Sequence, residues 1–318
     1  MSPTRRGFLE VGVRSGVAAT LLSRIPAWAS VQEALIRKPI PSTGERIPVI
    51  GLGSAGTFDL TPRSRDWEPA REVIRRFHRL GGRVIDTAPS YGRAEAFIGQ
   101  TVQELGIQNE LFLATKVNVG RAEESAAVAE MEASSRAFGK PTVDLMQVWN
   151  LGDSIRSLTD RFLDAHMAVV TEWKASGRTR YIGITTSRDP QYADVEAAMN
   201  RYTIDFVQLD YSIADRVPEQ RLLPLAREKG IAVITNRPYA GGSLFRRVSG
   251  PVPPWAAECD CRSWGQFFLK FNVSHPAVTC AIPATSDPEH LVDNMGACVG
   301  KLPDESMRRR MAEHVMGR

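Results

Sequence analysis

Three polar residues in the first half of the chain have the types and spacing for acid–base chemistry. Asp86 and Lys116 each end a short β-rich run, and Tyr91 follows shortly after Asp86. An ammonium group beside a phenol favours the phenolate, which makes the phenol a usable proton donor, and a carboxylate would fix the ammonium in place. The alternative interpretation is a structural ion pair next to a surface tyrosine.

The elements that must position these residues repeat along the chain as short β-rich runs, each followed by a helical pattern. The runs end 24 to 47 residues apart, which is typical of βα units. Eight such runs favour a closed (β/α)8 TIM barrel, an α/β fold whose strand ends meet at one mouth. An open doubly wound sheet is the weaker alternative, because no G-x-G-x-x-G motif follows the first run. The runs cover residues 49–52, 84–86, 111–116, 144–149, 181–185, 206–209, 232–235 and 278–282, and the helical patterns include 68–80, 94–105, 158–176, 192–201 and 219–229.

Two segments depart from a plain barrel. Residues 36–40 and 46–50 flank a short polar turn and predict a β-hairpin that plugs the N-terminal mouth. Residues 239–262 are rich in glycine and proline and predict a loop after strand seven. This loop would lie over the C-terminal face, where barrel enzymes keep their active sites.

Several short motifs follow one another in order along the chain. They read DTAPSYG at 86–92, LATK at 113–116, VDLMQ at 143–147, IGIT at 182–185, FVQ at 206–208 and IPATS at 282–286. Together they resemble the aldo-keto reductase superfamily, over residues 47 to 297. The resemblance implies reduction of a small carbonyl substrate, an aldehyde or ketone, by a nicotinamide nucleotide. It also implies that Tyr91 is the general acid, tuned by Asp86 and Lys116.

The chain departs from the family pattern at the end of its fourth run. That pattern resembles V-D-L-x-Q-V-H-N, whereas residues 143–150 read V-D-L-M-Q-V-W-N, so Trp149 stands in place of a histidine. Indole supplies one N–H donor and does not titrate, so it can orient a carbonyl but cannot shuttle a proton. Asn150 is no automatic substitute, because successive strand residues face opposite sides. The alternative function is therefore a nicotinamide-nucleotide-binding barrel with little or no turnover, a sensor or binding module.

The resemblance also assigns residues to a cofactor, NADP(H) more readily than NAD(H). Hydroxyl and amide side chains suit a nicotinamide carboxamide, and glycines let backbone N–H groups approach a pyrophosphate. A helix that starts at Pro288 would offer an anion site at its N-terminus, unless it is simply a capped surface helix. Asn236 takes the place of a stacking aromatic residue. The matched residues are Thr185, Thr186 and Gln208 for the carboxamide, Gly241, Gly242 and Leu244 for the pyrophosphate, and Thr285, Ser286, His290 and Asn294 for the adenosine end.

The first 29 residues predict a targeting segment rather than part of the fold. Arg5-Arg6 before Phe8-Leu9 resembles a twin-arginine signal, an apolar stretch follows, and residues 27–29 offer an A-x-A cleavage site. Four arginines against one glutamate give this segment +3 of the chain's net charge of +4. We expect recognition by the twin-arginine export machinery, a periplasmic or otherwise exported location, and a single domain over residues 30–318. A frayed N-terminal helix is the alternative.

Composition excludes several other classes. The chain has 318 residues, of which 43% are hydrophobic and 24% charged, as in globular proteins. No apolar run reaches the roughly 18 residues of a membrane span, and the basic residues are too scattered to support nucleic-acid binding. No metal site is expected, because the four cysteines fit neither zinc-ligand nor disulfide spacing. A barrel hydrolase would need a pair of carboxylates at strand ends. Only Asp86 is evident there, apart from Asp210, which we expect to be structural, so the sequence does not favour a hydrolase.

Overall fold

Eight parallel strands form the centre of the molecule, in a computed structural model that describes residues 35–117, 124–149, 160–187 and 191–317. Each strand pairs with the next along the chain, from β3 to β10. The backbone N–H of Gly51 then donates to the carbonyl of Ala281 at 2.8 Å, which joins the first strand region to the last. The sheet therefore closes into a barrel. Its strands are β3 (Leu52–Gly53), β4 (Val84–Asp86), β5 (Phe112–Val117), β6 (Val143–Val148), β7 (Thr179–Thr185), β8 (Phe206–Asp210), β9 (Ala232–Asn236) and β10 (Val278–Ala281).

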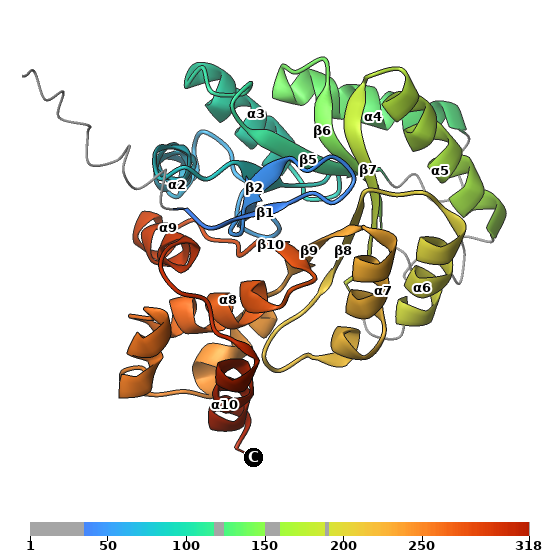
Figure 1. Cartoon of the computed structure of the whole chain (residues 1–318). Coiled ribbons are helices and arrows are strands. Elements are labelled where there is room, and N and C mark those ends of the chain that lie inside the picture. Colours follow the sequence, from blue (N-terminus) through green and yellow to red (C-terminus); the bar gives the residue numbers. More distant parts are fainter. Residues whose placement is uncertain (1–34, 118–123, 150–159, 188–190, 318) are drawn as a thin grey trace, which may run out of the picture.

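Helices surround this barrel and alternate with its strands (Figure 1). One helix follows each strand from β3 to β10, and a final helix continues the chain beyond them. The (β/α)8 barrel predicted from the sequence is confirmed, and the open doubly wound sheet is wrong. The helices are α2 (Trp67–Arg79), α3 (Ala94–Glu104), α4 (Glu124–Phe138), α5 (Asp160–Ala175), α6 (Tyr192–Arg201), α7 (Leu222–Lys229), α8 (Trp264–Ser274), α9 (Pro288–Met295) and α10 (Glu305–Met316).

The burial pattern of each element explains why these segments fold as they do. All six residues of β6 are buried, because a parallel strand in a barrel packs against side chains on one face and helices on the other. In α2, by contrast, one stripe is buried, at Trp67, Ala70, Val73, Ile74 and Phe77. That spacing is the apolar face of an amphipathic helix laid on a sheet.

Two glycines allow the barrel to close. A Cβ at Gly51 would stand 2.9 Å from the Val84 carbonyl oxygen, and one at Gly53 would stand 2.7 Å from that of Ile282. No larger residue fits where β3 passes between β4 and β10. The glycines of the short G-L-G sequence thus serve barrel closure.

A β-hairpin plugs the N-terminal mouth, as the sequence predicted. It consists of β1 (Arg37–Pro39) and β2 (Arg46–Pro48), which pair antiparallel. Ile40 and Ile47 of this hairpin belong to the same buried cluster as Val84, Phe112 and Phe206, which lie at the starts of barrel strands. The hairpin therefore seals the barrel interior with hydrophobic side chains.

One predicted helix is interrupted in the structure. Instead of a continuous helix over 219–229, a short 3-10 helix η2 (Val217–Gln220) precedes α7. Arg221 between them has φ −142°, outside helical geometry. Pro224 explains the break, because its ring would clash with the carbonyl of Gln220 in a continuous helix and it has no N–H to donate.

The predicted loop after the seventh strand follows β9 and contains two short 3-10 helices, η3 (Ala240–Arg246) and η4 (Pro254–Cys259). Residues 1–29, with the predicted export signal, and Asn150 lie outside the described residues. Within the described ranges, none of the helices has the length and apolar character needed to cross a lipid bilayer.

Candidate active site at the carboxyl ends of the strands

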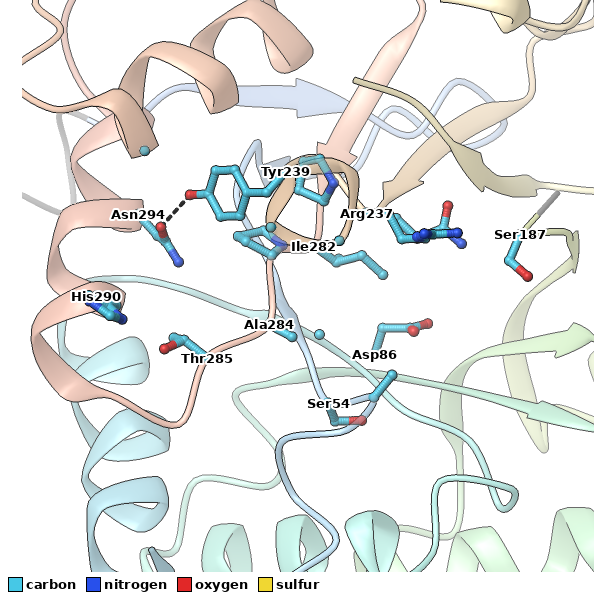
Figure 2. Close-up of a pocket in the computed structure, with 18 of the residues that line it drawn as sticks. Ser54, Asp86, Ser187, Arg237, Tyr239, Ile282, Ala284, Thr285, His290 and Asn294 are labelled. Atoms are coloured by element: carbon cyan, nitrogen blue, oxygen red, sulfur yellow. Dashed lines mark hydrogen bonds between the residues drawn. The ribbon is translucent and has the colours of Figure 1, made fainter. Parts of the chain in front are cut away.

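A cavity of about 920 Å³ opens at the carboxyl ends of the strands. Its walls come from strand ends and from the loops after β3, β7, β9 and β10 (Figure 2). The structure brings most of the sequence-predicted site residues to this one cavity. Those that line it are Asp86, Tyr91, Trp149, Thr185, Gln208, Gly241, Gly242, Thr285, His290 and Asn294.

Asp86 and Lys116 form a buried ion pair beneath the cavity. The Lys116 ammonium donates to Asp86 Oδ1 at 2.6 Å and to the Thr87 carbonyl at 2.8 Å. Gln147 Nε2 donates to the other carboxylate oxygen of Asp86 at 3.1 Å. The side chains of the pair are 4% and 1% exposed, so the two charges neutralise one another out of reach of bulk water.

The same ammonium lies next to the Tyr91 ring, with Lys116 Nζ 5.0 Å from the ring centroid. Burial by itself would lower the pKa of Lys116, but Asp86 and Tyr91 outweigh burial and hold that pKa above its ordinary value. Lys116 is therefore a fixed positive charge at neutral pH. A phenol beside a fixed cation in a cavity wall is suited to donate its proton.

Trp149 lines the cavity beside Tyr91, directly after β6. Its indole meets the Tyr91 ring edge to face, with ring centroids 6.4 Å apart and planes at 87°. The backbone N–H of Trp149 donates to the Val117 carbonyl at 3.0 Å, which fixes its position between neighbouring strands. The residue that departs from the family pattern is thus in direct contact with Tyr91.

Two amide side chains each have a buried polar atom without a partner among the described residues. Gln208 accepts from the Thr185 hydroxyl at 3.1 Å, which leaves its Nε2 unpaired. Asn236 donates to the Thr186 carbonyl at 3.3 Å, which leaves its Oδ1 unpaired. Both residues line the cavity from the neighbouring strands β8 and β9. Unpaired buried amides are destabilising unless a ligand supplies the missing donor and acceptor.

The turn after β9 has an unusual backbone. Arg237 and Ala240 have φ of 48° and 49°, and Gly241 and Gly242 follow with 64° and 83°. The left-handed region suits glycine but disfavours other residues by about 1–2 kcal/mol each. The two glycines carry no Cβ, so the cavity wall here is bare backbone.

Arg237 pairs with a buried carboxylate and was not predicted as a site residue. Its Nη1 donates to Asp210 Oδ2 at 3.2 Å, and it lines the cavity. Burial raises the pKa of Asp210 to about 7, against the opposing charge of Arg237. The sequence offered one signal, since Arg237 lies two residues after the predicted strand over 232–235, but its backbone conformation is a tertiary feature.

At the other end of the cavity, α9 begins behind an aspartate. Asp287 accepts from the backbone N–H groups of Glu289 and His290 at 2.7 and 3.2 Å. The side chain of Asp287 therefore caps this helix, and it occupies two of the first-turn donors that an anion would use. His290 is exposed and lines the cavity.

Asn294 on α9 is tied to the loop after β9. Tyr239, which the sequence analysis did not single out, donates its hydroxyl to Asn294 Oδ1 at 2.5 Å (Figure 2). Burial raises the pKa of Tyr239 well above its ordinary value, and Asp293 adds to the effect. The tyrosine thus stays protonated and holds the two sides of this end of the cavity together.

Three predicted cofactor residues do not line the cavity. Thr186 is buried and donates its hydroxyl to Gln191, Leu244 is buried in the main hydrophobic core, and Ser286 lies between Thr285 and the cap. Their assignment stays a prediction. In the part of the chain that the structure describes, no three His, Cys, Asp or Glu residues gather in a group that could hold a metal ion.

Comparisons with known proteins agree on one family. The model of the Aldo/keto reductase family matches residues 49–313. The NADH-specific methylglyoxal reductase of Escherichia coli is 27% identical over 311 residues, which cover 83% of this chain and 92% of that protein. The aldo-keto reductase of Klebsiella pneumoniae in complex with NADPH is 23% identical, covers 88% of this chain and 96% of its own, and superposes with a TM-score of 0.71. The aldo-keto reductase AKR11C1 of Bacillus halodurans, in its holo form, also has a TM-score of 0.71, with 21% identity.

Proposed function

The chain belongs to the aldo/keto reductase family and is an NAD(P)H-dependent oxidoreductase of that type, and we propose that it reduces an aldehyde or ketone with Tyr91 as the general acid. The observation that carries this proposal is the buried Asp86–Lys116 pair placed against Tyr91 at the cavity wall. A structural ion pair alone would not explain why a cavity-lining phenol lies over the ammonium. The substrate is a small carbonyl compound.

Each residue of the trio has one role in this mechanism. Tyr91 donates its phenolic proton to the carbonyl oxygen as negative charge develops there. Lys116 remains charged and stabilises the phenolate that is left, and Asp86 holds the ammonium at 2.6 Å. When bound, the reduced nicotinamide supplies the hydride for the carbonyl carbon. Trp149 limits the space beside Tyr91, so it favours small substrates.

The cavity residues fit a nicotinamide. The unpaired Gln208 Nε2 and Asn236 Oδ1 offer one donor and one acceptor on neighbouring strands. A carboxamide carries the complementary acceptor and donors, so these two residues would hold it, with Thr185 orienting Gln208 at 3.1 Å. Asn236 would thus act as a hydrogen-bonding residue where other family members place a stacking aromatic residue.

The remaining cofactor residues support NADP(H) in preference to NAD(H). His290 is exposed at the end of the cavity where the adenosine would lie, and an imidazole N–H there would donate to a 2′-phosphate oxygen. Gly241 and Gly242 would admit the pyrophosphate along bare backbone. The relative in Escherichia coli is described as NADH-specific, so the preference must be measured with both nucleotides.

A second candidate function is a nicotinamide-nucleotide-binding barrel with little or no turnover. Trp149 favours it, because the indole occupies the position beside Tyr91 where a titratable side chain would assist proton transfer. The cofactor contacts would then be kept for sensing or binding. Turnover with small aldehydes separates the two candidates.

We also propose that residues 1–29 direct export by the twin-arginine route. The support is the order of three features in the sequence, namely the paired arginines, the apolar stretch and the A-x-A site. That route transports folded proteins, so a cofactor bound in the cytoplasm could accompany the chain to the periplasm.

The test of the proposed function replaces Tyr91 with phenylalanine. We expect NADPH oxidation with small aldehydes to fall by about 10²–10⁴, the typical contribution of a general acid. The dissociation constant of NADPH should change less than about twofold, because the ring stays in place. Tyr202→Phe is the matched control, since that hydroxyl pairs with Asp164 and does not line the cavity. Undiminished reduction by Tyr91→Phe would rule out the mechanism.

A further inference from the structure

The backbone of Arg237 has a conformation that is unfavourable for a residue with a side chain. Its φ of 48° lies in the left-handed region, where a residue with a Cβ is strained. A non-glycine residue with φ above zero is uncommon and tends to occur at functional sites. This strained backbone places Arg237 in the lining of the cavity.

The two terminal nitrogens of the Arg237 guanidinium lie next to different neighbours. Nη1 donates to Asp210 Oδ2 at 3.2 Å. Nη2 lies on the side of the glycine turn, because a Cβ added at Gly241 would stand 3.4 Å from it. No described residue accepts a hydrogen bond from Nη2. Nη1 is thus held by Asp210, whereas Nη2 faces the bare backbone of the cavity wall.

Asp210 acts here as a positioning residue. Its side chain is 10% exposed, whereas that of Arg237 is 55% exposed. The buried carboxylate restricts an otherwise mobile surface arginine to one orientation, which lowers the entropy lost when a ligand binds. Figure 2 places Arg237 across the cavity from His290, on the side of Ser187, so the two side chains would meet different parts of a ligand.

We propose that Arg237 binds an anionic group of the ligand through Nη2 at the Gly241 turn, while Asp210 holds Nη1. A planar guanidinium presents parallel N–H donors that suit phosphate and carboxylate oxygens. Two sources share this chemistry, namely the diphosphate of the nicotinamide nucleotide and the carboxylate of an acidic carbonyl substrate. The nearness of the glycine turn favours the diphosphate. The inference rests on the proposed function, which supplies both ligands.

The experiment measures the dissociation constants of NADH and NADPH by titration calorimetry for the full chain and for Arg237→Ala. The diphosphate is common to both nucleotides, so we expect both constants to rise about tenfold, equivalent to about 1.4 kcal/mol. The loss should shrink as salt is raised, because half of the arginine side chain is exposed to screening. By contrast, a residue that meets the 2′-phosphate would affect NADPH alone.

Two further variants keep the result interpretable. Arg237→Gly removes the guanidinium and adopts the left-handed backbone without strain, so it should fold and lose the same affinity. Arg246→Ala removes an equal charge from the same loop at an exposed position outside the cavity. It should leave both constants unchanged, whereas a long-range charge effect would weaken binding in this variant too.

The substrate arm compares the KM of glyoxylate with that of a neutral aldehyde of similar size. A KM rise for glyoxylate alone, with nucleotide affinities unchanged, would assign Arg237 to a substrate carboxylate. Unchanged nucleotide affinities together with unchanged KM values would overturn the inference and leave the proposed function standing. A chain that binds neither nucleotide would refute the proposed function and this inference with it.

Discussion

Replacing Asp86 with asparagine removes the carboxylate that faces Lys116 and leaves a buried ammonium without its counter-charge. Both side chains of the pair are under 5% exposed, and breaking such a pair on one side typically destabilises a protein by about 3–5 kcal/mol. Asparagine still offers an acceptor to Lys116 Nζ, so the lower end, about 3 kcal/mol, is expected. Unfolding entropy of ~2.1 cal/mol/K per residue over about 280 residues gives roughly 0.6 kcal/mol/K, so the midpoint temperature should fall by about 5 °C.

The loss of unfolding free energy in Asp86→Asn should depend on pH in a defined direction. In the unmodified chain the pKa of Lys116 is held above its ordinary value of 10.5, so the contribution of the pair is complete at lower pH and declines only as pH rises through that raised pKa. In Asp86→Asn burial dominates and lowers the pKa of Lys116. The unfolded chain then binds more protons than the folded one, and the stability of the variant rises with pH by up to about 1.4 kcal/mol per unit. The difference in unfolding free energy between the unmodified chain and Asp86→Asn should therefore become smaller from pH 7 to pH 9.5.

Urea unfolding at pH 7 and pH 9.5, followed by circular dichroism, measures both effects. Asp66→Asn is the matched control, because Asp66 is exposed and lies 3.5 Å from Arg65, a surface pair that contributes about 0–1 kcal/mol. A variant as stable as the unmodified chain at pH 7, or a gap that is the same at both pH values, would refute the argument that Asp86 compensates a buried charge.

Three other predictions concern the site and the N-terminus. Trp149→His supplies a titratable donor and acceptor beside Tyr91 and opens space, so it should raise NADPH oxidation with small aldehydes; a lower rate on every aldehyde would make Trp149 a catalytic adaptation. His290→Ala should weaken NADPH more than NADH in equilibrium titrations, because only NADPH carries the 2′-phosphate, and equal losses would contradict that role. Deleting residues 1–29 should leave a soluble chain with a cooperative melt, while Arg5-Arg6→Lys-Lys in the full chain should block export to the periplasm; a misfolded truncation or unimpaired export would refute the signal.

Much of the barrel could be predicted from the sequence because its determinants are local and periodic. Short β-rich runs alternate with helical patterns, and both β5 and β6 are buried along their whole length. In a parallel barrel all carboxyl strand ends meet at one mouth. For this reason the positions of Asp86 and Lys116 at strand ends sufficed to predict that they meet, although 30 residues separate them.

The details of the predicted cofactor site depended on tertiary structure. Thr186 and Leu244 fit the family pattern, yet their side chains lie outside the cavity lining, because the direction of a loop side chain depends on the backbone around it. The unpaired amides of Gln208 and Asn236 could not be predicted, since being unpaired is a property of all surrounding groups at once. The orientation of Arg237 rests on a left-handed backbone and on a carboxylate 27 residues away. Sequence periodicity therefore determined the barrel and the meeting of Asp86 with Lys116, whereas long-range contacts and loop backbone conformation decided which polar atoms face the cavity.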